Sequence, residues 1–244
     1  MFTLGHFIWL GSIAVAIAAA LTVTKKFNVR TDTVQKIVFY VLVVLKLFHV
    51  CLSMKESPDG GFVINQTQLS FHLCSLMIYS VILINVIKNE KFVKIIKSFM
   101  VPCMLIGAAM ALLIPTEGVN VSTPRVWQYM LIHGTLVFYG LYLMIVEKVD
   151  LSFKTYLTNL KLLMVTVVLA FLMNSVLEQY NTNFLFLRKP PMDNLPILNL
   201  NNGWYVYFLT LAAVACLLLF LVHLPFVIGE AKKRKQNRSK DTNI

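Results

Sequence analysis

The chain has 244 residues, of which 58% are hydrophobic and only 14% are charged, and its mean hydropathy is +0.73. A water-soluble protein of this length could not bury so much apolar surface, so the composition predicts a protein that lies in a lipid bilayer. The apolar runs are continuous rather than alternating, which excludes a lipid-facing β-barrel. The net charge of +11 is typical of proteins that bind either nucleic acid or an anionic membrane surface.

Seven apolar runs are long enough for membrane spans, since a helix of about 20 residues crosses the roughly 30 Å hydrocarbon core. The first is expected to be a retained span, because no basic region precedes it and no clear cleavage site follows it. The sequence therefore predicts an all-α fold, a bundle of seven transmembrane helices in one domain over residues 1–230. Residues 231–244 are expected to form a basic, disordered cytoplasmic tail. The predicted spans lie near residues 5–23, 34–54, 69–87, 95–114, 126–146, 159–177 and 204–228.

Basic residues are concentrated in every second polar break of the chain. The positive-inside rule places these breaks in the cytoplasm, so the N-terminus is predicted to lie outside and the C-terminus inside. The same residues account for most of the net charge, which therefore indicates membrane topology and anionic headgroups rather than nucleic acid. They are Lys25, Lys26, Arg30 and Lys36 after the first run, Lys88, Lys91, Lys94 and Lys97 after the third, Lys148, Lys154 and Lys161 after the fifth, and Lys232, Lys233, Arg234, Lys235, Arg238 and Lys240 in the tail.

With this orientation, many of the polar residues inside the spans fall at one depth, in the outer half. Ionisable groups inside a bilayer are costly and normally face the bundle interior or an aqueous cavity, so this layer predicts a site. The alternative is that they are interfacial side chains that reach the headgroups. The layer comprises His6, Lys46, His49, His72, Cys74, Gln128 and His133, whereas His223 lies near the inner end of the last span.

The chemistry open to this layer is narrowed by what the sequence lacks. It contains no HExxH, CxxC or GxSxG motif and no carboxylate pair within a span. A thiol with imidazoles remains, which suits nucleophilic acyl transfer: Cys74 would attack an ester carbonyl, His133 would move the proton and Lys46 would supply positive potential. Two alternatives stay open. One is that Cys74 is a small core hydrophobe, and the other is that His6, His49, His72 and His133 hold a zinc ion.

The longest outer connection, roughly residues 178–203, is rich in asparagine and proline and carries several apolar residues. A segment of this length and composition is expected to fold back over the bundle as a lid.

Short motifs along the chain resemble the YwaF family of bacterial integral membrane proteins, which is related to the animal acyltransferase transmembrane protein 164. Their order and spacing cover essentially the whole chain. The motifs are Gly5-His6-Phe7, the run Gln68-Leu69-Ser70-Phe71-His72-Leu73-Cys74-Ser75-Leu76, Gly107 with Ala111-Leu112-Leu113-Ile114-Pro115, Gln128 with His133, and Asn183-Phe184-Leu185-Phe186-Leu187-Arg188-Lys189-Pro190.

This resemblance implies a seven-helix fold and acyl transfer among phospholipids. In the animal relatives a cysteine and a histidine form the catalytic pair, and they align with Cys74 and His133. Family members often carry an acidic residue in the second span, where this chain has Lys46 or His49.

Together these observations predict a membrane acyltransferase, with Cys74 and His133 as catalytic residues. It would move a fatty acyl chain from a glycerophospholipid to a lysophospholipid or a lipoprotein amine through a cysteine thioester. Asn183 and Gln128 would polarise the carbonyl, and Arg188 and Lys189 would hold a headgroup phosphate. No cofactor or resident metal and no nucleic acid is expected, and a bacterial cell membrane is the expected location. The alternatives are a lipid hydrolase and a non-catalytic lipid-binding or transport protein. The predicted substrate-binding residues are His6, Lys46, His49, His72, Gln128, Asn183, Arg188 and Lys189.

Overall fold

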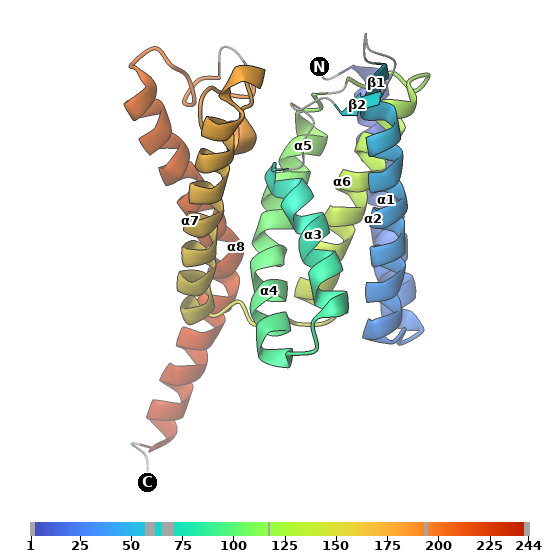
Figure 1. Cartoon of the computed structure of the whole chain (residues 1–244). Coiled ribbons are helices and arrows are strands. Elements are labelled where there is room, and N and C mark those ends of the chain that lie inside the picture. The colour runs from blue at the N-terminus through green and yellow to red at the C-terminus, as the bar shows by residue number, and fades with distance from the viewer. Residues whose placement is uncertain (1–2, 57–61, 65–70, 117, 193–194, 242–244) are drawn as a thin grey trace.

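The computed structural model describes residues 3–56, 62–64, 71–116, 118–192 and 195–241. The chain forms a bundle of long helices, and a short antiparallel hairpin of β1 (Met54–Glu56) and β2 (Phe62–Ile64) at one end is its one departure from the predicted all-α fold within those residues (Figure 1). The α-helices are α1 (Leu4–Lys26), α2 (Thr31–Ser53), α3 (Leu73–Val86), α4 (Glu90–Cys103), α5 (Ala109–Leu113), α6 (Pro124–Ile145), α7 (Phe153–Val176) and α8 (Trp204–Asp241). A π-helix, η2 (Met104–Ala108), joins α4 to α5, and the 3-10 turns η3 (Glu178–Tyr180) and η4 (Phe184–Phe186) lie between α7 and α8.

Six helices in the described part of the chain are long and apolar enough to cross a membrane. Five of them are α1, α2, α6, α7 and α8. The sixth is the continuous rod Glu90–Leu113, which α4, η2 and α5 form together. The protein is therefore an integral membrane protein. The predicted span 69–87 corresponds to α3, whose 14 residues extend about 21 Å, less than the hydrocarbon thickness. Residues 69 and 70 of that predicted span lie outside the described residues.

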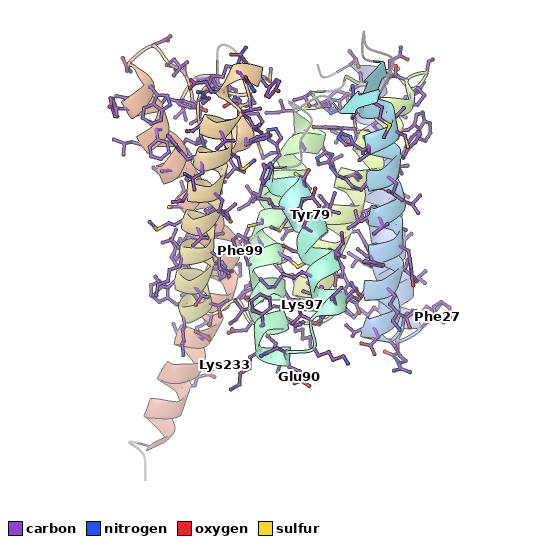
Figure 2. The ribbon with its side chains drawn as sticks, in the orientation of Figure 1. Phe27, Tyr79, Glu90, Lys97, Phe99 and Lys233 are labelled. Carbon is purple, nitrogen blue, oxygen red and sulfur yellow. The ribbon has the colours of Figure 1, made fainter. Side chains whose placement is uncertain are left out.

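The two ends of the bundle differ. The N-terminus and the β1–β2 hairpin lie at one end, called the upper end here, and the C-terminus lies at the opposite, lower end (Figure 1). Figure 2 shows Phe27, Glu90 and Lys233 toward the lower end. The tail predicted as disordered from residue 231 is helical through Asp241. After Gly229 this stretch contains mainly Ala, Lys, Arg and Gln, which favour helix, and it has no proline.

Helix α6 lies at the centre of the larger group of helices. It packs on α1, α2, α4, α5 and η2, and buried residues recur along its whole length. Gly140 brings α6 close to η2, because a Cβ added at Gly140 would lie 3.1 Å from the Met104 Cβ. Helices α7 and α8 pair with each other and join the bundle through α4 (Figure 1).

A proline in α4 explains a buried polar network near the lower end. Pro102 has no N–H, so the carbonyl of Ser98, four residues earlier, loses its usual helical partner. The Asn159 side chain of α7 donates to this carbonyl at 2.9 Å and also to His223 Nε2 of α8 at 3.1 Å. His223 Nδ1 in turn donates to the carbonyl of Leu151 at 3.0 Å. His223, which stood apart in the sequence, thus holds three segments together.

Replacing Asn159 by leucine should therefore lower the free energy of unfolding by about 2–4 kcal/mol, because two buried acceptors lose their donor. Thermal unfolding in detergent measures this change. Thr158→Ala is the matched control, since the Thr158 hydroxyl is exposed and bonds only within its own helix. In a Pro102→Ala background the restored N–H can serve Ser98, so Asn159→Leu should cost less there. Equal costs in both backgrounds would contradict this role of Pro102.

Candidate functional site

His133 has a defined tautomer in the upper half of α6. Its Nδ1 lies 2.7 Å from the carbonyl of Tyr129, one turn earlier, and the two rings are 4.2 Å apart between centroids. A carbonyl only accepts hydrogen bonds, so Nδ1 carries the proton, and in the neutral imidazole Nε2 carries the lone pair. The Tyr129 hydroxyl donates to the carbonyl of Ala111 at the end of α5, 3.0 Å away. Tyr129 thus orients His133, a role that the sequence analysis missed because an interfacial tyrosine is common in any span.

Two further predicted residues lie beside His133. His49 Nδ1 of α2 is 3.4 Å from Gln128 Oε1 of α6, and His49 is close enough to His133 to interact with it electrostatically. Gln128 is buried, whereas His49 and Lys46, one turn earlier on α2, are half-buried. The structure therefore brings His49, Gln128 and His133 together, as the sequence predicted from their depth.

His6 is buried at the start of α1 and is tied to a different element. Its Nε2 donates to the carbonyl of Leu112 at 2.8 Å. Leu112 lies in the last turn of α5, where carbonyl groups have no partner within the helix. His6 and Tyr129 together satisfy two of these carbonyls. The structure thus gives His6 a contact that fastens α1 to α5.

Cys74 lies in the first turn of α3, and its thiol faces the π-helix η2. A Cβ added at Gly107 would lie 3.5 Å from the Cys74 sulfur and 3.3 Å from Leu73, so the glycine keeps space open beside the thiol. The residue is partly exposed, and Cys103 is near enough to interact with it electrostatically. A π-helix inside a longer helix is frequent at functional sites.

Cys74 and His133 lie on neighbouring helices, α3 and α6, in the same half of the bundle. In the described part of the chain no hydrogen bond joins the two side chains, and the His133 ring bonds to the Tyr129 carbonyl instead. A catalytic pair is often separated in the unliganded protein and closes when the substrate binds.

His72, two residues before Cys74, belongs to another part of the upper end. Its ring packs against Phe184 and Phe186, with centroids 5.7 and 5.3 Å away. The four outer histidines thus divide among three environments. In the described residues no group of three or more His, Cys, Asp or Glu side chains is arranged to hold a metal ion.

The segment that follows α7 is clamped onto the ends of α7 and α8. Asn174 of α7 bonds both backbone groups of Phe184, accepting from its N–H at 2.8 Å and donating to its carbonyl at 3.1 Å. On the other side, the Trp204 indole donates to the carbonyl of Leu187 at 2.9 Å, and the Tyr207 hydroxyl donates to that of Phe186. The clamping residues were not predicted, although a lone asparagine near the end of an apolar run was a signal for Asn174.

Asn183 organises this segment from within. Its amide donates to the carbonyl of Lys189 at 2.8 Å, and its Oδ1 accepts from the backbone N–H groups of Arg188 and Lys189. The side chain predicted to polarise a substrate carbonyl is therefore taken up by the loop. The clamp and this internal closure together set the position of Arg188.

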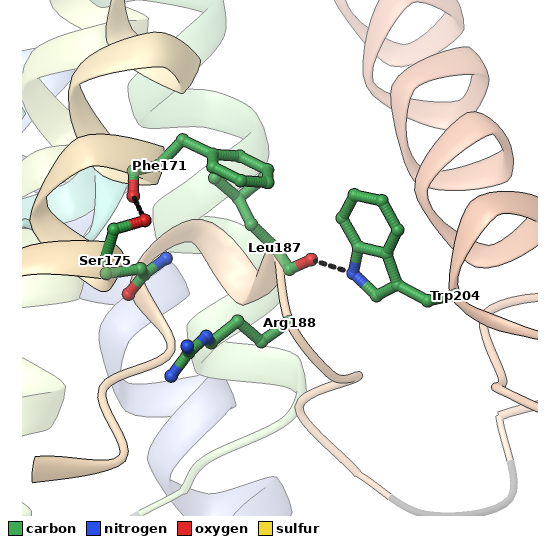
Figure 3. A pocket seen from close by; sticks show the side chains of 6 residues that line it. Phe171, Ser175, Leu187, Arg188 and Trp204 are labelled. Atoms are coloured by element: carbon green, nitrogen blue, oxygen red, sulfur yellow. Dashed lines mark hydrogen bonds between the residues drawn. The ribbon is translucent and has the colours of Figure 1, made fainter. Parts of the chain in front are cut away.

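A pocket of about 250 Å³ opens between α7, this segment and the start of α8. Figure 3 shows the rings of Phe171 and Trp204 near Leu187, with the Arg188 side chain on the side of Ser175. Arg188 forms an ion pair of 2.6 Å with Glu178. Lys189, the other predicted phosphate ligand, is exposed and does not line the pocket. The lining residues are Phe171, Asn174, Ser175, Leu187, Arg188 and Trp204.

The chain matches a known protein family over most of its length. Residues 1–223, which include the whole bundle apart from the last part of α8, match the TMEM164 family. The chain belongs to the TMEM164 family. This confirms the family resemblance read from the motifs. No curated protein and no solved structure matches the chain at a significant level.

This member of the TMEM164 family is thus an integral membrane protein whose upper half holds most of the predicted residues in three places. His49, Gln128 and His133 form one group, Cys74 lies against Gly107, and the Arg188 segment closes the α7–α8 side.

Proposed function

We propose that this protein is a membrane acyltransferase that transfers a fatty acyl chain from a glycerophospholipid through a thioester on Cys74. The observation that carries the proposal is the tautomer of His133. The Tyr129 carbonyl accepts the Nδ1 proton, so Nε2 is the basic nitrogen in the same half of the bundle as Cys74, which lies on the neighbouring helix α3. Membership in the TMEM164 family is compatible with this activity.

In the proposed reaction His133 Nε2 takes the proton of the Cys74 thiol, directly or through one water molecule, once the lipid is bound. The thiolate attacks the ester carbonyl and forms a carbon–sulfur bond. The carbon–oxygen ester bond then breaks, and the imidazolium returns its proton to the departing alkoxide, which leaves as a lysophospholipid. A hydroxyl of a second lysophospholipid, or a lipoprotein amine, gives its proton to His133, attacks the thioester and restores the thiol.

Other side chains of the upper half support these steps. The Gln128 amide nitrogen is not used in the contact with His49 and is the proposed donor to the oxyanion. Lys46, one helical turn before His49 on α2, is the proposed source of positive potential near the site. Arg188 is the proposed ligand of the headgroup phosphate.

We propose that the chain passes the membrane seven times, with the upper end outside and the lower end in the cytoplasm of a bacterial cell. Two observations support this orientation. The termini lie at opposite ends of the bundle, which requires an odd number of passes. The lower end carries the turns that contain Lys26, Lys91 and Lys148.

The test is to trap the acyl-enzyme. Purified protein is mixed with phospholipid, quenched with acid and digested, and the peptides are weighed by mass spectrometry. An acyl mass on the peptide that contains Cys74, removed by hydroxylamine and missing in Cys74→Ser, is the expected result. Phospholipid turnover with no acyl mass on Cys74 at any time would favour a hydrolase that uses water, and binding without turnover would favour a lipid-binding protein.

A further inference from the structure

The pocket between α7 and α8 combines an apolar wall with one strong positive charge. Phe171, Leu187 and Trp204 supply the apolar wall, and the Arg188 guanidinium lies at its edge (Figure 3). Below the pocket the outward faces of α7 and α8 are apolar and exposed, including Leu172 at 57% and Leu209 at 67%. A positive charge above exposed apolar helix faces fits an amphiphile with a negative head and aliphatic tails.

Arg188 has capacity for a second anion. A guanidinium carries five N–H donors, and the recorded bond to Glu178 uses one of its nitrogens. The Glu178 side chain is 72% exposed and that of Arg188 is 35% exposed. Exposed ion pairs contribute little to stability, because both charges remain hydrated. A phosphate diester can therefore share Arg188 with Glu178 or take its place.

The segment that bears Arg188 also contacts His72, two residues before the proposed nucleophile Cys74. Leu187 and Phe186, the residues before Arg188, are held by Trp204 and Tyr207. The rings of Phe184 and Phe186 contact His72, which directly precedes the helix on which Cys74 lies. A ligand held at Arg188 is thus two residues along the chain from Phe186, whose ring contacts the residue directly before α3.

The geometry points to this pocket as the docking site of a glycerophospholipid, with its headgroup phosphate on Arg188 and its acyl chains along the exposed faces of α7 and α8. This inference rests on the proposed function, because it makes the bound lipid the acyl donor. It assigns ligand binding to Arg188 and not to Lys189 or Asn183. Lys189 lies outside the pocket, and the Asn183 amide bonds the loop backbone.

The experiment measures binding rather than catalysis. Protein purified in a non-ionic, phosphate-free detergent is titrated with dihexanoylphosphatidylglycerol by isothermal calorimetry. Dihexanoylglycerol, which lacks the phosphate, and inorganic phosphate, which lacks the lipid, serve as separate probes. Saturable binding of the phospholipid alone is expected. Equal affinity for inorganic phosphate, or for dihexanoylglycerol, would overturn the assignment of a phospholipid.

Two substitutions at the ion pair should act in opposite directions. Arg188→Gln should weaken phospholipid binding about tenfold, the loss expected for one charge-assisted contact. Glu178→Gln should strengthen it about two- to fivefold, because the competing carboxylate is gone. Arg30→Gln is the control, since Arg30 also pairs with an exposed carboxylate, that of Asp32, but at the other end of the bundle. Weaker binding in both Arg188→Gln and Glu178→Gln would show that the pair only holds the loop and would overturn the proposal.

This experiment separates the docking site from the acyl-transfer chemistry. Cys74→Ser should bind the phospholipid as the wild type does. If the expected binding pattern is found and no acyl mass forms on Cys74, the proposed reaction fails and the docking site stands. If Cys74 is acylated but binding does not depend on Arg188, the docking site fails and the reaction stands.

Discussion

Replacement of Cys74 by alanine should lower the rate of acyl transfer by at least about a thousandfold, which corresponds to roughly 4 kcal/mol of transition-state stabilisation. Cys103, the thiol that interacts electrostatically with Cys74, is buried and is not expected to replace it as the nucleophile. The measurement is the release of labelled lysophospholipid and the labelling of the acceptor by protein reconstituted in vesicles. Cys74→Ser should retain little activity, since a serine hydroxyl is far less ionised than a thiol.

Cys51→Ala is the matched control for this prediction. Cys51 is also a free cysteine, on α2, and it is exposed on the surface of the bundle. Its replacement should leave the rate unchanged, which separates loss of the nucleophile from a general effect of removing a thiol. Wild-type activity in Cys74→Ala would rule out the thioester route, and a similar loss in both variants would argue against a specific role for Cys74.

Replacement of Lys97 by methionine should lower the free energy of unfolding by about 2–4 kcal/mol, because it leaves a buried carboxylate without its cation. Lys97 Nζ of α4 lies 2.7 Å from Glu147 Oε1, just after α6, and the two side chains are only 10% and 21% exposed. The second oxygen of Glu147 is buried and has no hydrogen-bond partner among the described residues. The measurement is thermal unfolding of the purified protein in detergent.

The double variant Lys97→Met/Glu147→Leu tests whether the loss arises from an unpaired charge. With both charges removed, stability should return to within about 1 kcal/mol of the wild type. Arg30→Met is the surface control, since both side chains of its ion pair with Asp32 are largely exposed, and its midpoint should not move. A double variant as unstable as Lys97→Met would contradict the prediction.

Much of the candidate site could be anticipated from depth along each span. His49, Gln128 and His133 were expected at one level, and the structure groups them. Depth alone could not show that His6 would bond the Leu112 carbonyl or that His72 would pack on Phe184 and Phe186. Those contacts depend on how each helix is rotated about its axis, which is decided by packing against its neighbours.

In the loop after α7 as well, some features could be predicted from the sequence and others depend on the tertiary structure. Its length and composition predicted a segment that folds onto the bundle. The residues that hold it, Asn174, Trp204 and Tyr207, come from the two helices that flank it, α7 before it and α8 after it. Arg188 lines a pocket only because these residues hold the loop between α7 and α8, and Asn183 closes the loop by bonding its backbone.

The sequence by itself determined the membrane character, the helical class, the apolar segments and the family, because hydrophobicity, segment length and short motifs are properties of contiguous residues. The tertiary structure alone decided which polar groups meet. Lys97 and Glu147 both belonged to the basic, polar breaks of the sequence, yet α4 begins at Glu90 and carries Lys97 two turns inward, where packing against α6 buries the pair. The energy of such a contact depends on burial and on a partner 50 residues away, and neither is encoded in the local pattern.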